Sequence, residues 1–269
     1  MEYSPYNPKN VPFTARDIQA LLRSHGLPTY TIQSPLLFQK AMVHSTYVRR
    51  AEYTTLTGSP ATLAPCPPGV LDLCDDSYEQ LEFVGDSMLG SVVANYLHER
   101  FPEGNPGFLT NTRKLLVRNR TLGLLAKNNL KLDTFFVISK HVEEMKPEHG
   151  RQNLEKLGDV LEAFIAALWF DSGKDYNTVY TFITTVIETY LDIPTLLRED
   201  DNYKDRMQKH CQQAFHYTPI YTMINSLNGE FTMAVCTPSG EVLGTGVSTT
   251  KKTAEQNACK AALHTWGLN

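Results

Sequence analysis

Long apolar runs and paired cysteines are both scarce in this chain of 269 residues. No apolar run reaches about eighteen residues and no signal-peptide pattern follows Met1, so we expect a soluble intracellular protein, cytoplasmic or nuclear, without a membrane partner. The five cysteines are odd in number and scattered, which suits a reducing compartment better than a disulfide framework. Strand-like segments are nearly absent before residue 190, which favours an all-α domain there.

What the sequence does contain is a pair of acids inside an apolar segment with helical period. Leu81, Met88 and Val92 recur at helical spacing, so the segment should be a helix. Glu82 and Asp86 are four residues apart and project from one face of that helix. Two like charges among apolar neighbours repel each other and are poorly solvated, so we expect a cation to neutralise them.

A second acidic pair follows about seventy residues later. Asp159 and Glu162 are three residues apart within the apolar segment 157–169, and their carboxylates also project together. Neither segment has His or Cys at ligand spacing, which argues against zinc and for Mg²⁺ or Mn²⁺. Solvated acids on surface helices are the alternative, but the apolar flanking residues disfavour a free surface.

Four blocks of this sequence resemble the ribonuclease III family, in the order that the family has them. They match its N-terminal His-Ser motif, its signature, its connecting block and its second acidic motif: residues 41–47, 79–87, 106–117 and 158–163. In the connecting block, Pro106 stands where bacterial members have a glutamate, so the pattern looks eukaryotic or viral. The resemblance implies an all-α endonuclease domain.

The resemblance also implies a mechanism, namely metal-dependent hydrolysis of double-stranded RNA to 5′-phosphate and 3′-hydroxyl ends. Glu82, Asp159 and Glu162 would hold Mg²⁺, with Mn²⁺ as a substitute and no organic cofactor. Asp86 and Glu162 are the predicted catalytic residues, and Asp86 would orient water or assist proton transfer.

Cutting both strands of a duplex needs two acidic clusters, so we expect a homodimer with C2 symmetry. Phe83 follows Glu82 and should point away from it on a helix. By resemblance Phe83 plugs a socket on the partner, and the alternative is an ordinary core aromatic. His44 is expected to be a hydrogen-bonded structural residue rather than a catalytic one.

Composition divides the chain into a large and a small domain. We predict a flexible N-terminal arm over 1–13, a catalytic domain over 14–192 with an inserted loop at 51–77, a linker over 193–200, and a small domain over 201–269. Helices are expected at 15–22, 35–43, 78–100, 109–128, 153–172 and 176–190. One basic stretch is either a solvated helix face or a phosphate-contacting face: Arg113, Lys114, Arg118, Arg120, Lys127 and Lys131.

The small domain shows the order α-β-β-β-α and resembles a double-stranded RNA-binding domain, above all over 244–258. Gln208, Lys251 and Lys252 are its predicted RNA-binding residues, and the two lysines precede a final helix expected over 253–266. The usual Gly-Pro-His of the first hairpin loop is replaced by residues 225–229, which removes an expected minor-groove contact.

Two other functions stay open at the level of sequence. One is a non-catalytic scaffold that binds double-stranded RNA with the same fold, and the other is a regulator that sequesters duplex RNA. The intact acids Glu82, Asp86, Asp159 and Glu162 favour the metal-dependent endoribonuclease over both.

Overall fold

The computed structural model describes residues 2–54, 58–145, 149–198, 202–227 and 229–268. The chain forms two compact units, Met1–Pro194 and Thr195–Asn269. In the part of the chain that the structure describes, no helix combines the length and the apolar character that would let it cross a membrane.

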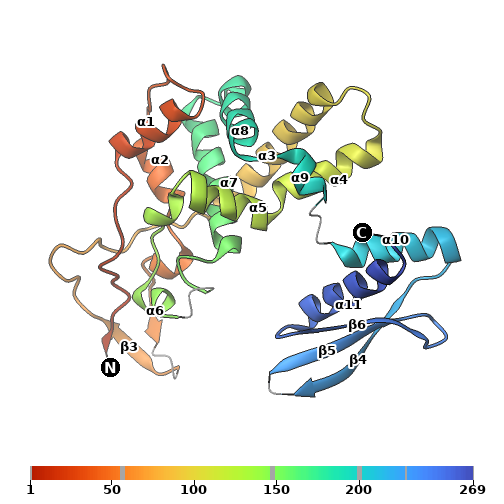
Figure 1. The fold of residues 1–269 in the computed structure, drawn as a ribbon. Coiled ribbons are helices and arrows are strands. Elements are labelled where there is room, and N and C mark those ends of the chain that lie inside the picture. The colour runs from red at the N-terminus through yellow and green to blue at the C-terminus, as the bar shows by residue number, and fades with distance from the viewer. Residues whose placement is uncertain (1, 55–57, 146–148, 199–201, 228, 269) are drawn as a thin grey trace. The chain divides into compact units, whose positions relative to one another are not determined.

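The first unit is built around two long helices, α3 (Glu79–Arg100) and α7 (Leu154–Asp171), which pack against each other along much of their length (Figure 1). Helix α7 is buried almost throughout because its neighbours surround it. The other helices of the unit are α1 (Ala15–Ser24), α2 (Pro35–Lys40), α4 (Pro106–Val117), α5 (Asn119–Leu124), α6 (Lys140–Glu143) and α8 (Tyr176–Tyr190), and α9 (Ile193–Arg198) spans the boundary at Pro194. This confirms the predicted all-α fold of the domain.

The predicted single helix over 109–128 is wrong, because the chain breaks at Arg118. Helix α4 ends at Val117, Arg118 is extended, and α5 is followed by a π-helical turn, η2 (Leu125–Asn129). The hydroxyl of Thr121 donates to the carbonyl of Leu115 at 2.7 Å. Because α4 ends at Val117, this carbonyl has no backbone N–H of its own helix to accept from, and the hydroxyl takes that place. The break brings α5 against α7.

Residues 2–13, predicted to be a flexible arm, pack against the rest of the first unit. Strand β1 (Glu2–Tyr3) pairs in parallel with β3 (Pro60–Leu63), and Tyr6 and Phe13 are buried. The Asn10 side-chain amide donates to the carbonyl of Ile138 at 3.0 Å, and its oxygen accepts from the Ile138 N–H at 3.2 Å. Polar residues in this segment therefore serve as hydrogen-bonding partners of the core.

Arg151 completes the anchoring of the arm. Its guanidinium donates to Asn10 Oδ1 at 3.0 Å and to Glu143 Oε2 at 3.0 Å. Asn7 Nδ2 also donates to Glu143 Oε2, at 3.1 Å. The arm is thus bonded to residues more than one hundred positions later in the chain, and Asn10 and Arg151 are 141 residues apart.

The inserted segment 51–77 also has structure of its own. Strand β2 (Tyr53–Thr54) pairs antiparallel with β3, while residues 55–57 lie outside the described ranges. Leu73 packs in an apolar cluster with Tyr6, Tyr47 and others. The segment is therefore a small lobe that shares a core with the arm, whereas an inserted loop was predicted.

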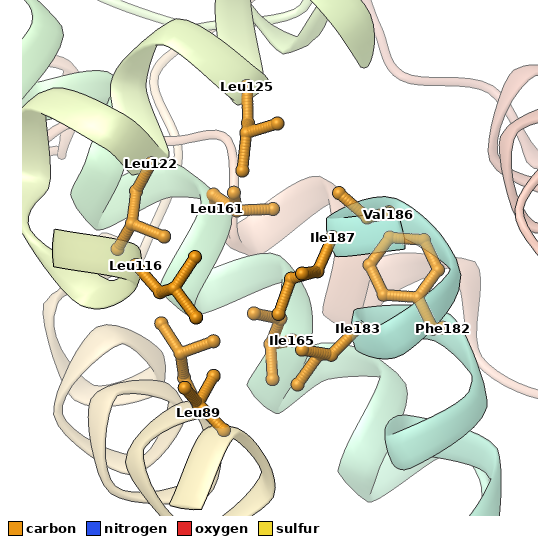
Figure 2. Close-up of a pocket in the computed structure, with 11 residues that line it drawn as sticks. Leu89, Leu116, Leu122, Leu125, Leu161, Ile165, Phe182, Ile183, Val186 and Ile187 are labelled. Atoms are coloured by element: carbon orange, nitrogen blue, oxygen red, sulfur yellow. The ribbon is translucent and has the colours of Figure 1, made fainter. Parts of the chain in front are cut away.

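The centre of the first unit is a close-packed apolar core. Where α3, α4, α5, α7 and α8 converge, only a small void of about 20 Å³ remains, surrounded by aliphatic side chains and Phe182 (Figure 2). A space of this size could hold one water, but apolar voids stay dry. This void belongs to the core and offers no ligand site.

The second unit confirms the predicted α-β-β-β-α order. It consists of α10 (Tyr203–Phe215), β4 (Ile220–Leu227), β5 (Glu230–Cys236), β6 (Val242–Ser248) and α11 (Lys251–Thr265). The antiparallel sheet has the order β4-β5-β6, and both helices cover one of its faces (Figure 1). Gly246 lets α11 approach closely, because a Cβ there would lie 2.3 Å from the Ala258 nitrogen.

Two boundaries differ from prediction around this unit. Part of the predicted linker 193–200 is helix α9. Helix α11 begins at Lys251, before the predicted residue 253, because Thr250 accepts a hydrogen bond from the Thr253 N–H and caps the helix.

Candidate metal centre

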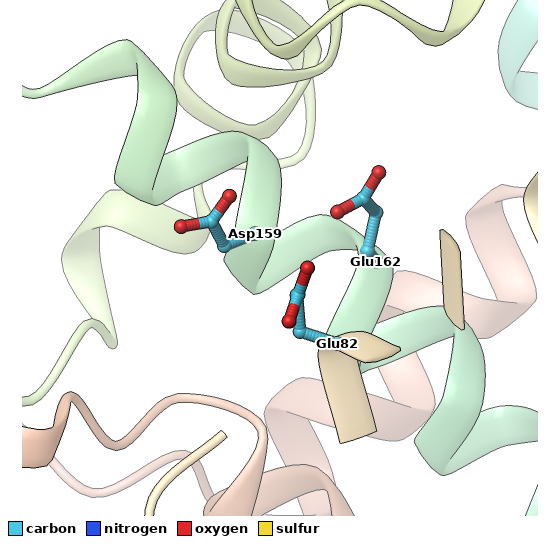
Figure 3. Close-up of side chains that lie close together, drawn as sticks. All are labelled: Glu82, Asp159 and Glu162. Carbon is cyan, nitrogen blue, oxygen red and sulfur yellow. The ribbon is translucent and has the colours of Figure 1, made fainter. Parts of the chain in front are cut away.

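Three carboxylates from the two long helices of the first unit meet at one point. Glu82 comes from α3, and Asp159 and Glu162 come from consecutive turns of α7 (Figure 3). One carboxylate oxygen of each lies within 4.8 Å of those of the other two. The structure thus brings together the three acids that were predicted to bind metal.

A glycine makes this meeting geometrically feasible. A Cβ on Gly85 would lie 1.8 Å from the carbonyl oxygen of Glu162, so α3 and α7 touch backbone to backbone there. Gly85 is three residues after Glu82, so the closest approach of the helices lies beside the acids. Any larger residue would separate the two halves of the cluster.

Burial and mutual repulsion both act on the cluster. Glu162 is 4% exposed, and desolvation, followed by the charges of Asp86, Asp159 and Glu82, raises its pKa to about 8. Desolvation and the charge of Glu82 raise the pKa of Asp159 to about 6, and the pKa of Glu82 is also raised, first by desolvation. Within the described residues, no Lys or Arg forms an ion pair with any of the three. A hard divalent cation fits this all-oxygen donor set.

These pKa values make a prediction about metal-free protein. A carboxyl group with a higher pKa in the folded state contributes stability that is present below its unfolded pKa and is lost as pH rises through its folded pKa. For Glu162 that range runs from 4.5 to about 8. In EDTA, the midpoint of thermal unfolding should fall across this range, and Glu162→Gln should flatten the fall. A midpoint that does not depend on pH would contradict the assigned burial.

Asp86 lies beside the cluster but outside it. It is exposed on α3, one turn after Glu82, and its charge contributes to the raised pKa of both Glu82 and Glu162. The structure therefore puts Asp86 near the acids without making it one of the three converging ligands.

Sequence reasoning did not identify two residues that hold Asp159. Asn119 Nδ2 donates to Asp159 Oδ1 at 3.0 Å, and the Tyr78 hydroxyl lies 3.5 Å from Asp159 Oδ2. Tyr78 directly precedes the signature helix, and Asn119 follows the extended residue Arg118. The helix break at Arg118, which the sequence did not predict, turns the Asn119 amide toward α7.

His44 has the structural role that was expected of it. Its Nδ1 accepts a hydrogen bond from the Thr46 N–H at 3.2 Å, and its ring makes edge contacts with Tyr78 and Phe136. Desolvation, followed by the charge of Lys156, lowers its pKa to about 4, so the ring is neutral at physiological pH. His44 thus supports Tyr78, which in turn contacts Asp159.

Phe83 is exposed and is not a core aromatic. Its side chain is 75% exposed on α3, although the residues on either side of it in sequence are half-buried. A ring exposed to this extent is available for contact with a partner. The alternative of an ordinary core aromatic is therefore wrong.

The basic stretch is spread over α4, α5 and the turns that follow. Arg113 and Lys114 are exposed on α4, and Arg120 is exposed on α5. Arg118 is half-buried and its Nε donates to Thr121 at 3.2 Å, so it also supports the helix break. Contact of the exposed members with phosphate stays a prediction.

In the second unit, the three predicted RNA-binding residues are all exposed on helices. Gln208 lies on α10, and Lys251 and Lys252 are the first two residues of α11. The Lys251 ammonium lies 5.6 Å from the centre of the Phe231 ring. Strand β4 runs to Leu227 and β5 begins at Glu230, and residue 228 between them lies outside the described ranges.

Comparisons with known proteins agree with this geometry. Residues 79–173 match the family model of the ribonuclease III domain, and residues 203–265 match that of the double-stranded RNA binding motif. The ribonuclease 3 of a Roseiflexus species is 38% identical over 194 residues, covering 70% of this chain and 78% of its own.

Two further similarities come from a virus and from a solved structure. A protein of Paramecium bursaria Chlorella virus 1 is 34% identical over 195 residues, covering 71% of this chain and 68% of its own. The nuclease domain of ribonuclease III from Campylobacter jejuni is 24% identical, with a TM-score of 0.48, and the match covers 65% of this chain and 97% of that domain.

Proposed function

We propose, since this chain belongs to the ribonuclease III family, that it cleaves double-stranded RNA as a Mg²⁺-dependent homodimer and leaves 5′-phosphate and 3′-hydroxyl ends. The observation that carries this proposal is the convergence of Glu82, Asp159 and Glu162, whose oxygens lie within 4.8 Å of one another. A scaffold that only bound RNA would have no need for uncompensated buried acids at this point.

Three of the acids would hold a metal, and the fourth would accept a proton. Glu82, Asp159 and Glu162 would hold Mg²⁺, with Mn²⁺ as a substitute. When bound, the metal supplies Lewis-acid polarisation of the scissile phosphate and a more acidic water. Asp86 is exposed beside the cluster, where it can orient the attacking water and accept its proton. Asn119 fixes the orientation of Asp159 through its hydrogen bond.

A dimer is supported by a knob and a hollow on one face of α3. Phe83 is the knob, and Ala94 and Leu97 line a hollow of about 310 Å³ between α3 and α4. Ala94 and Leu97 are eleven and fourteen residues after Phe83, so all three lie on one side of the helix. Gly90 lies between them and has nothing within 4 Å of a Cβ built there.

This arrangement is self-complementary. If two α3 helices pair antiparallel about a C2 axis, the start of each faces the end of the other. Phe83 of each copy then meets the hollow of its partner, and the small residue Gly90 near the axis lets the helices approach.

Phe83→Ala should therefore weaken the dimer. An interface aromatic that fills a pocket typically contributes ~2 kcal/mol or more, which corresponds to about a thirtyfold rise in the dimer dissociation constant. Sedimentation equilibrium at micromolar protein measures this. Leu36→Ala is the matched control, since Leu36 is 73% exposed on α2. An unchanged dimer in Phe83→Ala would refute the knob.

The second unit would supply duplex binding through Lys251 and Lys252 at the start of α11 and through Gln208 on α10. Lys251→Ala combined with Lys252→Ala should weaken binding to long duplex RNA and reduce the slope of log affinity against log salt by about one for each lysine–phosphate pair removed. Sequence preference should stay the same, because bonds to phosphate position the protein rather than specify a sequence. Filter binding in Ca²⁺ at several salt concentrations tests this. An unchanged slope would mean that neither lysine contacts phosphate.

Incubation of the purified protein with a long RNA duplex and Mg²⁺ tests the function directly. We expect discrete short duplexes whose 5′ ends become labelled only after phosphatase treatment, and no products in EDTA. Intact RNA at high protein concentration would instead support the non-catalytic scaffold. To distinguish the nuclease from a regulator that sequesters RNA, a cleavage-dead variant can be compared in cells with a variant that lacks the second unit.

A further inference from the structure

The metal centre of a single chain has more carboxylates than one divalent cation balances. Three acids converge, and Asp86 adds a fourth negative charge beside them. Lys156 lies one turn before Asp159 on α7, but its ammonium donates to the carbonyl of His149 at 2.9 Å. Among the described residues, no Lys or Arg forms an ion pair with Asp86. One chain therefore leaves this exposed acid without a cationic partner.

A suitable cation lies on helix α4. Arg113 is exposed there, and in the part of the chain that the structure describes it forms no ion pair. It lines the hollow of about 310 Å³ between α3 and α4, together with Ala94 and Leu97 of α3. In the dimer proposed above, this hollow receives Phe83 of the other copy. Arg113 therefore borders the place where the two copies would meet.

The spacing along α3 fixes which residues face each other in that dimer. Phe83 meets the hollow at Leu97, and Gly90 is midway between the two, so the twofold axis passes near Gly90. Asp86 and Ala94 lie four residues to either side of Gly90, about 6 Å along the helix. The register that seats Phe83 thus brings Asp86 of one copy to Ala94 of the other, at the wall of the same hollow.

Asp86 also points to the correct side of this contact. With 3.6 residues per turn, Asp86 and Leu97 are displaced from Phe83 in the same direction around the helix, by roughly 60° and 40°. A twofold axis perpendicular to paired helices keeps displacements of one sign on one side of the interface. Leu97 lines the hollow with Leu109 of α4, so α4 of the other copy lies on the side to which Asp86 projects.

We propose that Arg113 of each copy forms an ion pair with Asp86 of the other copy and so completes the metal centre of its partner. This pairing rests on the homodimer of the proposed function. A guanidinium is always charged and can bind a carboxylate through two N–H groups, which holds the carboxylate in one orientation. Arg113 is thus a positioning residue that acts across the interface, and neither metal centre is complete in a single chain.

Exchanging the two charges tests the pairing without a cleavage assay. Asp86→Arg places like charges opposite each other at two positions in the dimer, and it should raise the dimer dissociation constant about tenfold or more. Arg113→Asp should have the same effect, and the two changes together should restore the constant to within about threefold of wild type. Sedimentation at low salt measures all three variants. Arg23→Asp, an exposed change on α1, is the matched control. A double variant as weak as the single ones would overturn the pairing.

Mixed dimers test in which copy Arg113 acts. Chains with Arg113→Ala and chains with Glu162→Gln, carrying different tags, can be co-expressed and purified as heterodimers. The Glu162→Gln copy then supplies its Arg113 to the intact acids of the other copy. The heterodimer should therefore cleave one strand at about half of the wild-type rate, since one of two sites works. Each homodimer should be at least about tenfold slower than wild type. A heterodimer no faster than the Arg113→Ala homodimer would overturn the proposal, because Arg113 would then act in its own copy.

The remaining outcomes separate this proposal from the proposed function. If Arg113→Ala is a dimer that cleaves like the wild type, the role of Arg113 is wrong and the nuclease stands. If Arg113→Ala weakens duplex binding in Ca²⁺ in proportion to cleavage, Arg113 contacts phosphate and the pairing is wrong. Should Arg113→Ala not fold, Arg113→Gln replaces it. A wild-type monomer would overturn the dimer and the pairing together. Intact RNA with a wild-type dimer would overturn the nuclease, and the charge exchange would still decide the pairing.

Discussion

Glu162→Gln should abolish cleavage of duplex RNA while leaving the fold intact and RNA binding unchanged. Glu162 is the most buried of the three converging acids, and glutamine keeps its size while removing the charge that a metal needs. A catalytic metal contributes several kcal/mol, so we expect a fall of at least about a thousandfold, equivalent to ~4 kcal/mol. The fold should be no less stable, because the substitution relieves repulsion with Asp86, Asp159 and Glu82.

The decisive measurement is single-turnover cleavage at saturating enzyme, beside a binding measurement in Ca²⁺. Glu155→Gln is the matched control, because it makes the same change on an exposed position of α7. Excess Mn²⁺ should restore part of the activity of Glu162→Gln by binding the weakened site more tightly than Mg²⁺. Cleavage near the wild-type rate would remove Glu162 from the mechanism and leave the acidic cluster without a function.

Gly85→Ala should damage both the fold and the cluster. Its Cβ would lie 1.8 Å from the Glu162 carbonyl oxygen, and a backbone atom of a packed helix cannot rotate aside. The helices α3 and α7 must then move apart, which we expect to cost at least ~3 kcal/mol of the free energy of unfolding. A displacement of about 1 Å at the acids is enough to lower cleavage about a hundredfold.

Gly90→Ala on the same helix is the control for the fold of the single chain, and both variants are compared as dilute monomers because Gly90 lies near the proposed dimer axis. Nothing lies within 4 Å of a Cβ at Gly90, so this change should stabilise the helix by about 0.5–1 kcal/mol. Chemical denaturation of both variants in EDTA compares them without the influence of metal. If Gly85→Ala is as stable and as active as the wild type, the close crossing of α3 and α7 is not present in solution.

The acidic pairs were predictable because each depends only on spacing along one helix. Glu82 with Asp86, and Asp159 with Glu162, share a helix face wherever those helices lie. Glu82 meets Asp159 and Glu162 because α3 and α7 cross beside these residues. The spacing of residues along one helix does not predict where two helices cross. The family resemblance predicted that the three acids form one metal site. Gly85 is the residue that lets the two helices approach closely enough to form it.

The features that sequence reasoning got wrong depend on partners far away in the chain. Local propensity favours a helix through Arg118, and the break reflects the bond from Thr121 to Leu115 and the packing of α5 on α7. The strands β1, β2 and β3 are two to four residues long, too short to show alternation. Asn119 could not be assigned to Asp159, because the two are forty residues apart.

The anchoring of the N-terminal arm has a consequence for how the protein is made. Asn10 is synthesised 141 residues before its partner Arg151. At synthesis rates of about 5–20 residues per second, the arm waits roughly 7 to 28 s for that partner. Phe13 waits about as long, because its ring contacts are Phe135 and Phe164. The arm is therefore fixed in place only after Arg151 has been made, and ribosome-bound fragments that end before Arg151 should depend most on chaperones.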